Sequence, residues 1–472
     1  MRGFPLSQKN VETLGGVWKM STFHYFDTIA AVSTPYGKGG VAVIRLSGEE
    51  TAAIAARLFR PRSGKPLSAY PARQAVWGDI LSEGGQVLDD GLCTLFPAPH
   101  SFTGESVAEI SCHGGILITL RVLEACLQAG ARQALPGEFT RRAFLRGKLS
   151  LDEAEALGNL LDAGNEEQLR LSRAGMTGLL SRRTEAIYTA LCPVLANMEA
   201  GMDFPEEDLS ELTPAEIAAA VTEALAATER LLATYRTGHA IAEGIPTVIC
   251  GAPNAGKSSL YNRLVGRDAA IVTDMAGTTR DVLSETVTLG RVTLRLSDTA
   301  GLRESADPVE RIGVERARAA LEAAELVLYL IDPTSPEPTE PPLLSTETDR
   351  KTVLRIYTKA DLCPPPEDEG LSVSAVTGQG LDQLTAAIEN AYIDGSLRTG
   401  EEAVIFSARQ AAALSACAEA LRRSLGNLAL SLPADVCAED IREAMDALGE
   451  VCGRVPREDV ITEIFARFCV GK

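Results

Sequence analysis

The stretch Gly251-Ala252-Pro253-Asn254-Ala255-Gly256-Lys257-Ser258 has the spacing of a phosphate-binding loop, Gly-x-x-x-x-Gly-Lys-Ser, and it decides the fold of its domain. The amides of residues 254–257 can surround a phosphate at a helix N-terminus, where the helix dipole and unpaired N–H groups favour anions. Lys257 would neutralise phosphate oxygens, and Ser258 would offer its hydroxyl to Mg²⁺. The predicted phosphate contacts are Asn254, Ala255, Gly256, Lys257, Ser258 and Ser259.

Further motifs follow this loop in the order that a guanine-nucleotide domain requires, starting with Asp298-Thr299-Ala300-Gly301. Asp298 ends an apolar run and is predicted to hold Mg²⁺, with Thr279 as a second hydroxyl ligand. The amide of Gly301 can reach the γ-phosphate. Any one of these motifs can arise as a helix cap or a turn, but the ordered set predicts binding and hydrolysis of GTP.

The base is assigned to Thr358-Lys359-Ala360-Asp361 and to Ser374-Ala375. The Asp361 carboxylate can accept from guanine N1–H and N2–H₂, whereas adenine would leave it unpaired. Lys359 can lie along the base. Thr358 stands where Asn is usual, and its hydroxyl is expected to tie this loop to the phosphate-binding loop with fewer hydrogen bonds.

Leu302 follows Asp298-Thr299-Ala300-Gly301 at the position where small signalling GTPases carry a Gln that orients water. Leu cannot orient water, so another group must replace it. Acidic residues on the following segment are the candidates, although their charge also suits a helix start. They are Glu304, Asp307, Glu310 and Glu315.

Composition limits the partners and the compartment. The 472 residues are enough for two to four domains. The sequence has no run of eighteen apolar residues, so no membrane span is predicted, and residues 1–20 lack the pattern of a signal peptide. The ten cysteines form no Cys-x-x-Cys pair, which favours a reducing cytoplasm over a zinc site or disulfides. The net charge of −19 argues against a broad nucleic-acid surface, although the basic stretch 141–148 could touch RNA or be a solvated helix face.

The chain divides into an α+β domain, a helical domain and an inserted Ras-like α/β domain. We expect a disordered extension over 1–23 and an α+β domain over 24–142, with strands at 28–32, 40–46 and 106–112. A helical texture covers 143–243, where Thr213 and Pro214 predict a helix start, and it returns over 396–472. Between these halves, 244–395 alternates strands and helices as a doubly wound parallel sheet does. Its strands are expected at 246–250, 292–297, 326–331, 353–357 and 371–373, with an exposed loop over 333–349.

These motifs resemble the TrmE/Era branch of P-loop GTPases, and the chain from about residue 27 onward resembles the MnmE (TrmE) family of tRNA modification GTPases. The resemblance rests on Asn254, on the segments 277–281 and 298–303, and on Val309-Glu310-Arg311-Ile312-Gly313. It extends to signatures outside the G domain. These are Thr34-Pro35, Gly37-Lys38-Gly39-Gly40, Ser101-Phe102-Thr103-Gly104-Glu105, His113-Gly114-Gly115, Pro136-Gly137-Glu138-Phe139-Thr140 and Phe468-Cys469-Val470-Gly471-Lys472.

For hydrolysis, the resemblance implies that two G domains dimerise around a K⁺ ion that replaces an arginine finger. Glu310 matches the family's catalytic Glu, which acts through water. K⁺ would be held by Asn254, Thr273, Met275 and Thr278.

For the remaining chain, the resemblance implies a tetrahydrofolate-binding N-terminal domain that also dimerises. The residues that match the binding of a 5-formyl-tetrahydrofolate or related folate are Arg45, Glu109, Lys148 and Lys472. Arg45 by itself would read as a surface charge at a strand end. Cys469 is expected near the folate, and a prenylation site is disfavoured because Val470-Gly471-Lys472 does not fit that pattern. A Cys112–His113 dyad is discounted because neighbouring strand residues face opposite sides.

The implied activity is a K⁺-stimulated GTPase in the cytoplasm that acts on tRNA as a homodimer. With a flavin-dependent partner, MnmG (GidA), and a folate one-carbon unit, such a protein converts carbon 5 of the wobble uridine to an aminomethyl or carboxymethylaminomethyl form. GTP hydrolysis, which leaves GDP, drives conformational change. The alternatives are a ribosome-assembly GTPase of the Era type, which would need a basic RNA-binding appendage, and an independent folate-dependent aminomethyl transferase.

Overall fold

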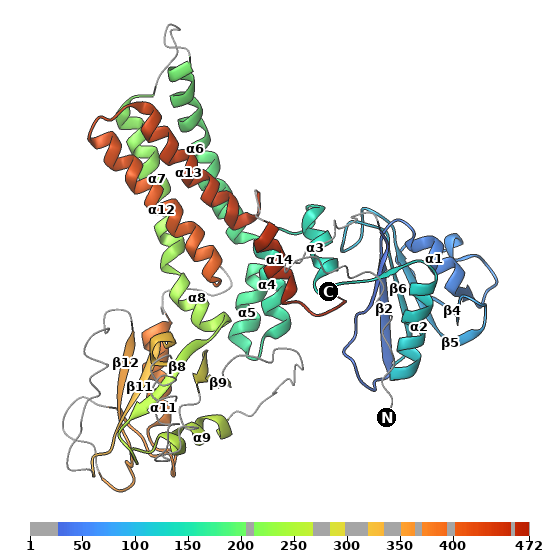
Figure 1. Cartoon of the computed structure of the whole chain (residues 1–472), viewed down its shortest axis with the longest axis horizontal. Coiled ribbons are helices and arrows are strands. Elements are labelled where there is room, and N and C mark those ends of the chain that lie inside the picture. The colour runs from blue at the N-terminus through green and yellow to red at the C-terminus, as the bar shows by residue number, and fades with distance from the viewer. Residues whose placement is uncertain are drawn as a thin grey trace, which may run out of the picture. The chain divides into compact units, whose positions relative to one another are not determined.

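A computed structural model describes residues 27–203, 212–267, 284–297, 320–334, 351–363, 371–393, 402–454 and 458–471. The chain forms two compact units, one made of residues up to 148 together with those from 465 onward, and the other of residues 149–464 (Figure 1). The described helices include none that is both long and apolar enough to cross a bilayer.

The N-terminal unit is built on a seven-stranded sheet of order β3-β4-β5-β6-β2-β1-β7, antiparallel except for the β1–β7 pair. Helices α1 and α2 bury one face of it, and alternate residues of β2 (Ala42, Ile44 and Leu46) point into that core. The intervening residues, such as Arg45, lie on the other face. The elements are β1 (Ile29–Val32), β2 (Val41–Ser47), α1 (Thr51–Leu58), β3 (Phe59–Pro61), η1 (Leu67–Ala69), β4 (Val76–Leu81), β5 (Val87–Phe96), β6 (Val107–His113), α2 (Ile116–Gln128), β7 (Arg132–Gln133) and α3 (Glu138–Leu145).

The second unit combines helices from both sides of the inserted domain. Helices α6, α7, α12 and α13 share one apolar core, in which α6 and α12 each pack against α7 and α13. The Thr213 side chain caps α7 and Pro214 begins it, as the sequence predicts. The helices are α4 (Leu151–Asp162), α5 (Glu166–Gly175), α6 (Leu179–Asp203), α7 (Pro214–Ala233), α8 (Tyr235–Ala242), α12 (Ala408–Ala429), α13 (Ala434–Cys452) and α14 (Glu458–Ala466), the end of which belongs to the N-terminal unit.

The inserted domain holds a six-stranded sheet of order β13-β12-β11-β8-β10-β9, parallel except for the β9–β10 hairpin. The predicted α/β fold and all five predicted strands are confirmed, whereas β9 went unrecognised in the sequence. Residues 335–349 of the expected exposed loop lie outside the described residues. The elements are β8 (Ile245–Gly251), α9 (Lys257–Arg267), β9 (Ser284–Leu289), β10 (Val292–Ser297), β11 (Leu326–Ile331), β12 (Thr352–Tyr357), β13 (Leu371–Ser372) and α11 (Leu381–Tyr392).

Candidate functional site

The phosphate-binding loop connects β8 to the N-terminus of α9, as its sequence predicts. Gly251 cannot carry a side chain because a Cβ there would lie 2.4 Å from the Leu330 carbonyl oxygen of β11. Asn254 adopts a left-handed conformation with φ 61° and is exposed, whereas Ala255 is buried beneath it. The loop therefore curves around the start of α9, where backbone amides favour an anion.

Lys257 lies across this loop. Its Nζ donates to the carbonyl oxygens of Gly251 at 3.0 Å and Ala252 at 2.9 Å. Ser258 and Ser259 lie in the first turn of α9, where both are exposed. The structure thus brings together a cation, two hydroxyls and a helix N-terminus, which is a donor set that fits phosphates with Mg²⁺.

The base-recognition residues gather at the carboxyl ends of β12 and β13. Ser374 is fully buried, and its Oγ donates to Asp361 Oδ1 at 2.6 Å. This bond holds the exposed Asp361 carboxylate in one orientation. Such a fixed acceptor suits the N–H edge of guanine.

Thr358 lies beside the phosphate-binding loop, but its hydroxyl does not bond to that loop. A Cβ built on Gly256 would lie 3.8 Å from Thr358 Cβ, so the two loops lie close together. The hydroxyl instead donates to the Ile331 carbonyl oxygen at 3.3 Å. The expected hydrogen bond between the loops is therefore wrong, because the hydroxyl bonds to a carbonyl oxygen at the end of β11 instead.

The other predicted hydrolysis residues lie outside the described residues. They are Thr273, Met275, Thr278, Thr279, Asp298, Thr299, Ala300, Gly301 and Glu310.

In the N-terminal unit, two predicted folate residues form an ion pair on the face of the sheet opposite to α1 and α2, where Phe139 of α3 packs. Arg45 and Glu109 face each other across β2 and β6, with Arg45 Nη2 2.8 Å from Glu109 Oε1. The Phe139 ring lies under the guanidinium, 5.8 Å from Arg45 Cζ. Lys148 lies apart from this pair and donates to the Pro99 carbonyl oxygen at 3.2 Å, while Lys472 is outside the described residues.

The C-terminal segment docks beside that ion pair. The carbonyl oxygen of Gly471 accepts from Ser33 Oγ at 3.2 Å and Arg45 Nη1 at 3.4 Å, across 426 residues of sequence in the second case. The amide of Gly137 donates to the Cys469 carbonyl oxygen at 3.4 Å. Cys469 is thereby held at the surface of this unit, two residues from the Arg45 contact.

Cys469 differs from the other cysteines of the chain in its exposure to solvent. Of the ten cysteines only Cys469 is exposed. Burial raises the pKa of Cys93 and Cys126 to about 12, and that of Cys112 to about 11. Because the thiolate is the nucleophile, these three are unreactive. Cys112 is buried whereas the adjacent His113 is exposed, which agrees with their predicted separation.

The basic stretch around α3 begins in a buried ion-pair network, so both sequence interpretations are wrong for Arg141 and Arg142, whereas Arg146 and Lys148 are exposed. Arg141 and Arg142 are 8% and 5% exposed. Arg142 contacts the carboxylates of Asp27, Glu105 and Glu138. Such side chains hold α3 against the sheet and are not available to RNA, because burying a charge requires compensating partners.

Sequence reasoning missed a polar contact between the helical and inserted domains. Asn165 Nδ2 and Gln168 Nε2 donate to Thr293 Oγ1 of β10 at 3.1 and 3.4 Å. Arg291 Nε donates to Glu167 Oε1 at 3.1 Å. The Gly290-Arg291 turn between two alternating runs was the signal for this hairpin, but nothing in the sequence pointed to α5 as its partner.

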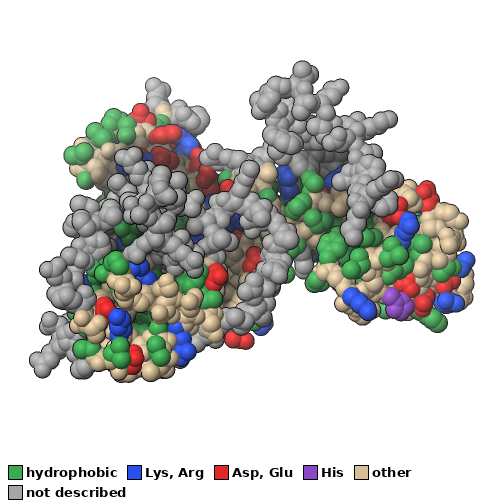
Figure 2. Space-filling view, turned by 60° about the horizontal axis from the view of Figure 1, so that its bottom comes forward, with side chains coloured by type: hydrophobic (Ala, Val, Ile, Leu, Met, Phe, Trp, Pro, Cys, Tyr) green, Lys and Arg blue, Asp and Glu red, His purple; other side chains and the backbone are tan. Residues whose placement is uncertain are grey.

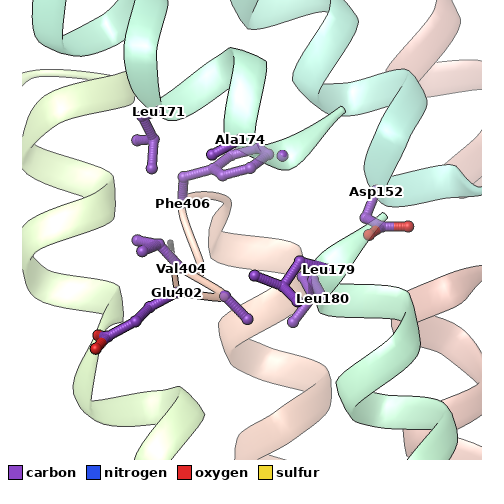
Figure 3. A pocket seen from close by; sticks show the side chains of 10 residues that line it. Asp152, Leu171, Ala174, Leu179, Leu180, Glu402, Val404 and Phe406 are labelled. Atoms are coloured by element: carbon purple, nitrogen blue, oxygen red, sulfur yellow. The ribbon is translucent and has the colours of Figure 1, made fainter. Parts of the chain in front are cut away.

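A small pocket lies where the chain leaves the inserted domain, between α4–α6 and residues 402–406 (Figure 3). Leu171, Val404 and Phe406 give it apolar walls. Asp152, at one edge, is held by Ser181, whose Oγ and amide both donate to it. The pocket offers no reactive arrangement and is part of the packing at this junction.

Comparison with known proteins assigns both ends of the chain to one family. Residues 151–469 match the model of the MnmE helical domain, and residues 28–148 match that of the GTP-binding protein TrmE N-terminus. Two relatives bear the name tRNA modification GTPase MnmE. The one from Symbiobacterium thermophilum is 42% identical and covers 94% of this chain and 99% of its own length. The one from Chloroflexus aurantiacus is 43% identical and covers 94% of this chain and 100% of its own length.

Solved structures of FeoB G domains are similar to part of this chain. The G domain of the T. maritima FeoB iron transporter is 28% identical with a TM-score of 0.24, covering 31% of this chain and 98% of its own. The FeoB G-domain from Methanococcus jannaschii is 23% identical with the same TM-score, and it covers 31% of this chain and 97% of its own. With the phosphate-binding loop, the base-recognition loops and both family matches in place, the chain belongs to the MnmE family of tRNA modification GTPases.

Proposed function

We propose that this GTPase acts in tRNA modification at carbon 5 of the wobble uridine, together with a flavin-dependent partner of the MnmG (GidA) kind. Its product would be an aminomethyl or carboxymethylaminomethyl uridine. The observation that carries this proposal is the exposed Cys469, held near the Arg45–Glu109 ion pair in one compact unit. A thiol, a guanidinium and a carboxylate thus gather in one region of this unit.

The donor set there fits a folate, which would supply the one-carbon unit when bound. Glu109 can accept from the N–H edge of a pterin, and Arg45 can meet an anionic tail. Since these two side chains are bonded to each other and are 31% and 18% exposed, a folate would flank or replace that ion pair. Lys148 and Lys472 remain predicted contacts.

For hydrolysis we propose Mg²⁺ ligation by Ser258, Thr279 and Asp298, and K⁺ binding by Asn254, Thr273, Met275 and Thr278. The exposed left-handed Asn254 supports the K⁺ assignment, because its side chain emerges from the phosphate-binding loop itself. Glu310 would orient the attacking water, since Leu302 cannot.

Coupling of the nucleotide to the helical domain is supported by the α5–β10 contact. Strand β10 leads directly into Asp298, and Thr293 on it is held by Asn165 and Gln168. A shift of β10 on hydrolysis would therefore pull on α5.

We further propose a homodimer whose flavoprotein partner provides most of the tRNA surface. The net charge is −19, and Arg141 and Arg142 are internal. On the face shown in Figure 2, the basic side chains of the described residues are scattered among acidic ones. Such a surface is a poor phosphate binder by itself.

Mass spectrometry of tRNA nucleosides tests the proposal directly. A strain lacking this chain should lose the modified wobble uridine, and the wild-type chain should restore it. Cys469→Ser should fail to restore it, while Cys192→Ser in α6 serves as the matched control and should succeed. A nucleoside pattern that does not change on deletion would instead favour a ribosome-assembly GTPase.

The ion assignment has its own test. Replacing K⁺ by Na⁺ should sharply lower GTP turnover, and Glu310→Ala should slow turnover with nucleotide affinity nearly intact. Equal rates in both salts would reject the K⁺ site.

A further inference from the structure

Asp332, which no motif includes, forms an ion pair with the lysine of the base-recognition motif. Asp332 follows β11 and Lys359 follows β12, two neighbouring parallel strands paired at Ile331 and Tyr357. Lys359 Nζ lies 2.5 Å from Asp332 Oδ2. The Asp332 side chain is 10% exposed and that of Lys359 is 33% exposed, so the pair lies at the edge of the domain with its carboxylate largely covered.

Asp332 is itself fixed by a second set of bonds. Its Oδ1 accepts from the Thr334 amide at 2.9 Å and from Thr334 Oγ1 at 2.7 Å. Burial tends to raise the pKa of Asp332, but the hydrogen bonds from Lys359 and Thr334 outweigh it and hold that pKa below its usual value. The carboxylate is thus a charged and immobile anchor at neutral pH.

The other end of the Lys359 side chain is equally constrained. Its backbone has φ 58°, and its carbonyl oxygen accepts from the amides of Leu362 and Cys363. With the backbone held in this turn and Nζ held by Asp332, the aliphatic stem between them has little rotational freedom left.

We propose that Asp332 is a positioning residue for nucleotide binding, which holds the stem of Lys359 as a preformed platform for the purine ring. The proposal rests on the assignment of Lys359 to the base. Asp361 reads the edge of the base, whereas a platform contacts its face. Asp332 should therefore affect guanine and hypoxanthine nucleotides alike, and Asp361 should affect them differently.

The test measures dissociation constants of GDP and IDP for the full chain and for Asp332→Asn. Immobilising a long side chain on binding costs about tenfold in affinity, so both constants should rise about 5- to 10-fold with their ratio unchanged. KM for GTP should rise while kcat at saturation stays the same. Asp382→Asn, an exposed acid in the first turn of α11, makes the same charge change and should alter neither constant.

A double-mutant cycle separates positioning from a general loss of structure. In a Lys359→Met background, Asp332→Asn should cause no further loss of affinity. Additive losses, or unchanged affinity in the single variant, would overturn the proposal. Should Asp332→Asn fold poorly, Thr334→Val can replace it, because it keeps the Asp332 charge and removes only the hydrogen bond from the Thr334 hydroxyl. This variant must still weaken the binding of GDP and IDP equally, by about 2- to 3-fold. These measurements need no tRNA, so their failure would leave the proposed modification chemistry untouched.

Discussion

Replacing Gly471 by Ala should release the C-terminal segment from the N-terminal unit. Gly471 has φ 101°, and a Cβ there would lie 2.2 Å from the Val32 carbonyl oxygen, where ordinary contacts begin at 3.4 Å. The backbone conformation alone costs an L-residue about 1–2 kcal/mol. Relieving the overlap requires a displacement of about 1.2 Å, since 3.4 − 2.2 = 1.2.

The segment cannot stay docked through that displacement, because the free energy of its docking is similar in size to the strain that Gly471→Ala introduces. Three hydrogen bonds hold it, from Ser33, Arg45 and Gly137, at about 1 kcal/mol each. A docking free energy of about 3 kcal/mol corresponds to roughly 100-fold protection of the docked amides from exchange. We expect Gly471→Ala to abolish this protection while the sheet stays folded.

Hydrogen exchange with mass spectrometry measures this in the C-terminal peptide. Gly130→Ala is the matched control, since Gly130 has φ 106° but no atom within 4 Å of the point where a Cβ would lie. It should cost the same backbone strain, about 1–2 kcal/mol, without changing exchange at the C-terminus. If Gly471→Ala exchanges like the wild type, the steric argument fails and the segment is held by other contacts.

Three further predictions concern the helical junctions and the thiols. The contact with Glu325 raises the pKa of His239 of α8, so the protonated His239 should stabilise the fold below about pH 6.5 and lose this effect as pH rises through the folded-state pKa. Thermal melts should show this pH dependence in the wild type and not in His239→Gln. Arg409→Met should lower the free energy of unfolding by about 3–5 kcal/mol, because it leaves the largely buried Glu155 carboxylate without its bidentate partner; a loss below about 1 kcal/mol in urea titrations would contradict this. Brief alkylation of the native protein near pH 8 should label Cys469 before any buried thiol, which peptide mapping would show.

The sequence predicted most of the nucleotide site because that site is local. The turn at Asn254, the helix start at Lys257 and the acceptor at Asp361 are each fixed by a few consecutive residues, so their spacing carries the information. The same holds for the cap at Thr213. Prediction failed where a side chain could choose between partners from different elements: the Thr358 hydroxyl bonds to a carbonyl oxygen of β11 and not to the phosphate-binding loop.

What the sequence determined by itself is a GTP-binding domain inserted into a helical protein of the MnmE family, since contiguous motifs define backbone conformations that hardly depend on the rest of the chain. The tertiary structure decided which distant groups meet. It buried Arg142 among three carboxylates, paired Asp332 with Lys359, and carried Gly471 to Arg45 across 426 residues. Such contacts arise from the packing of whole elements, and no local pattern encodes them.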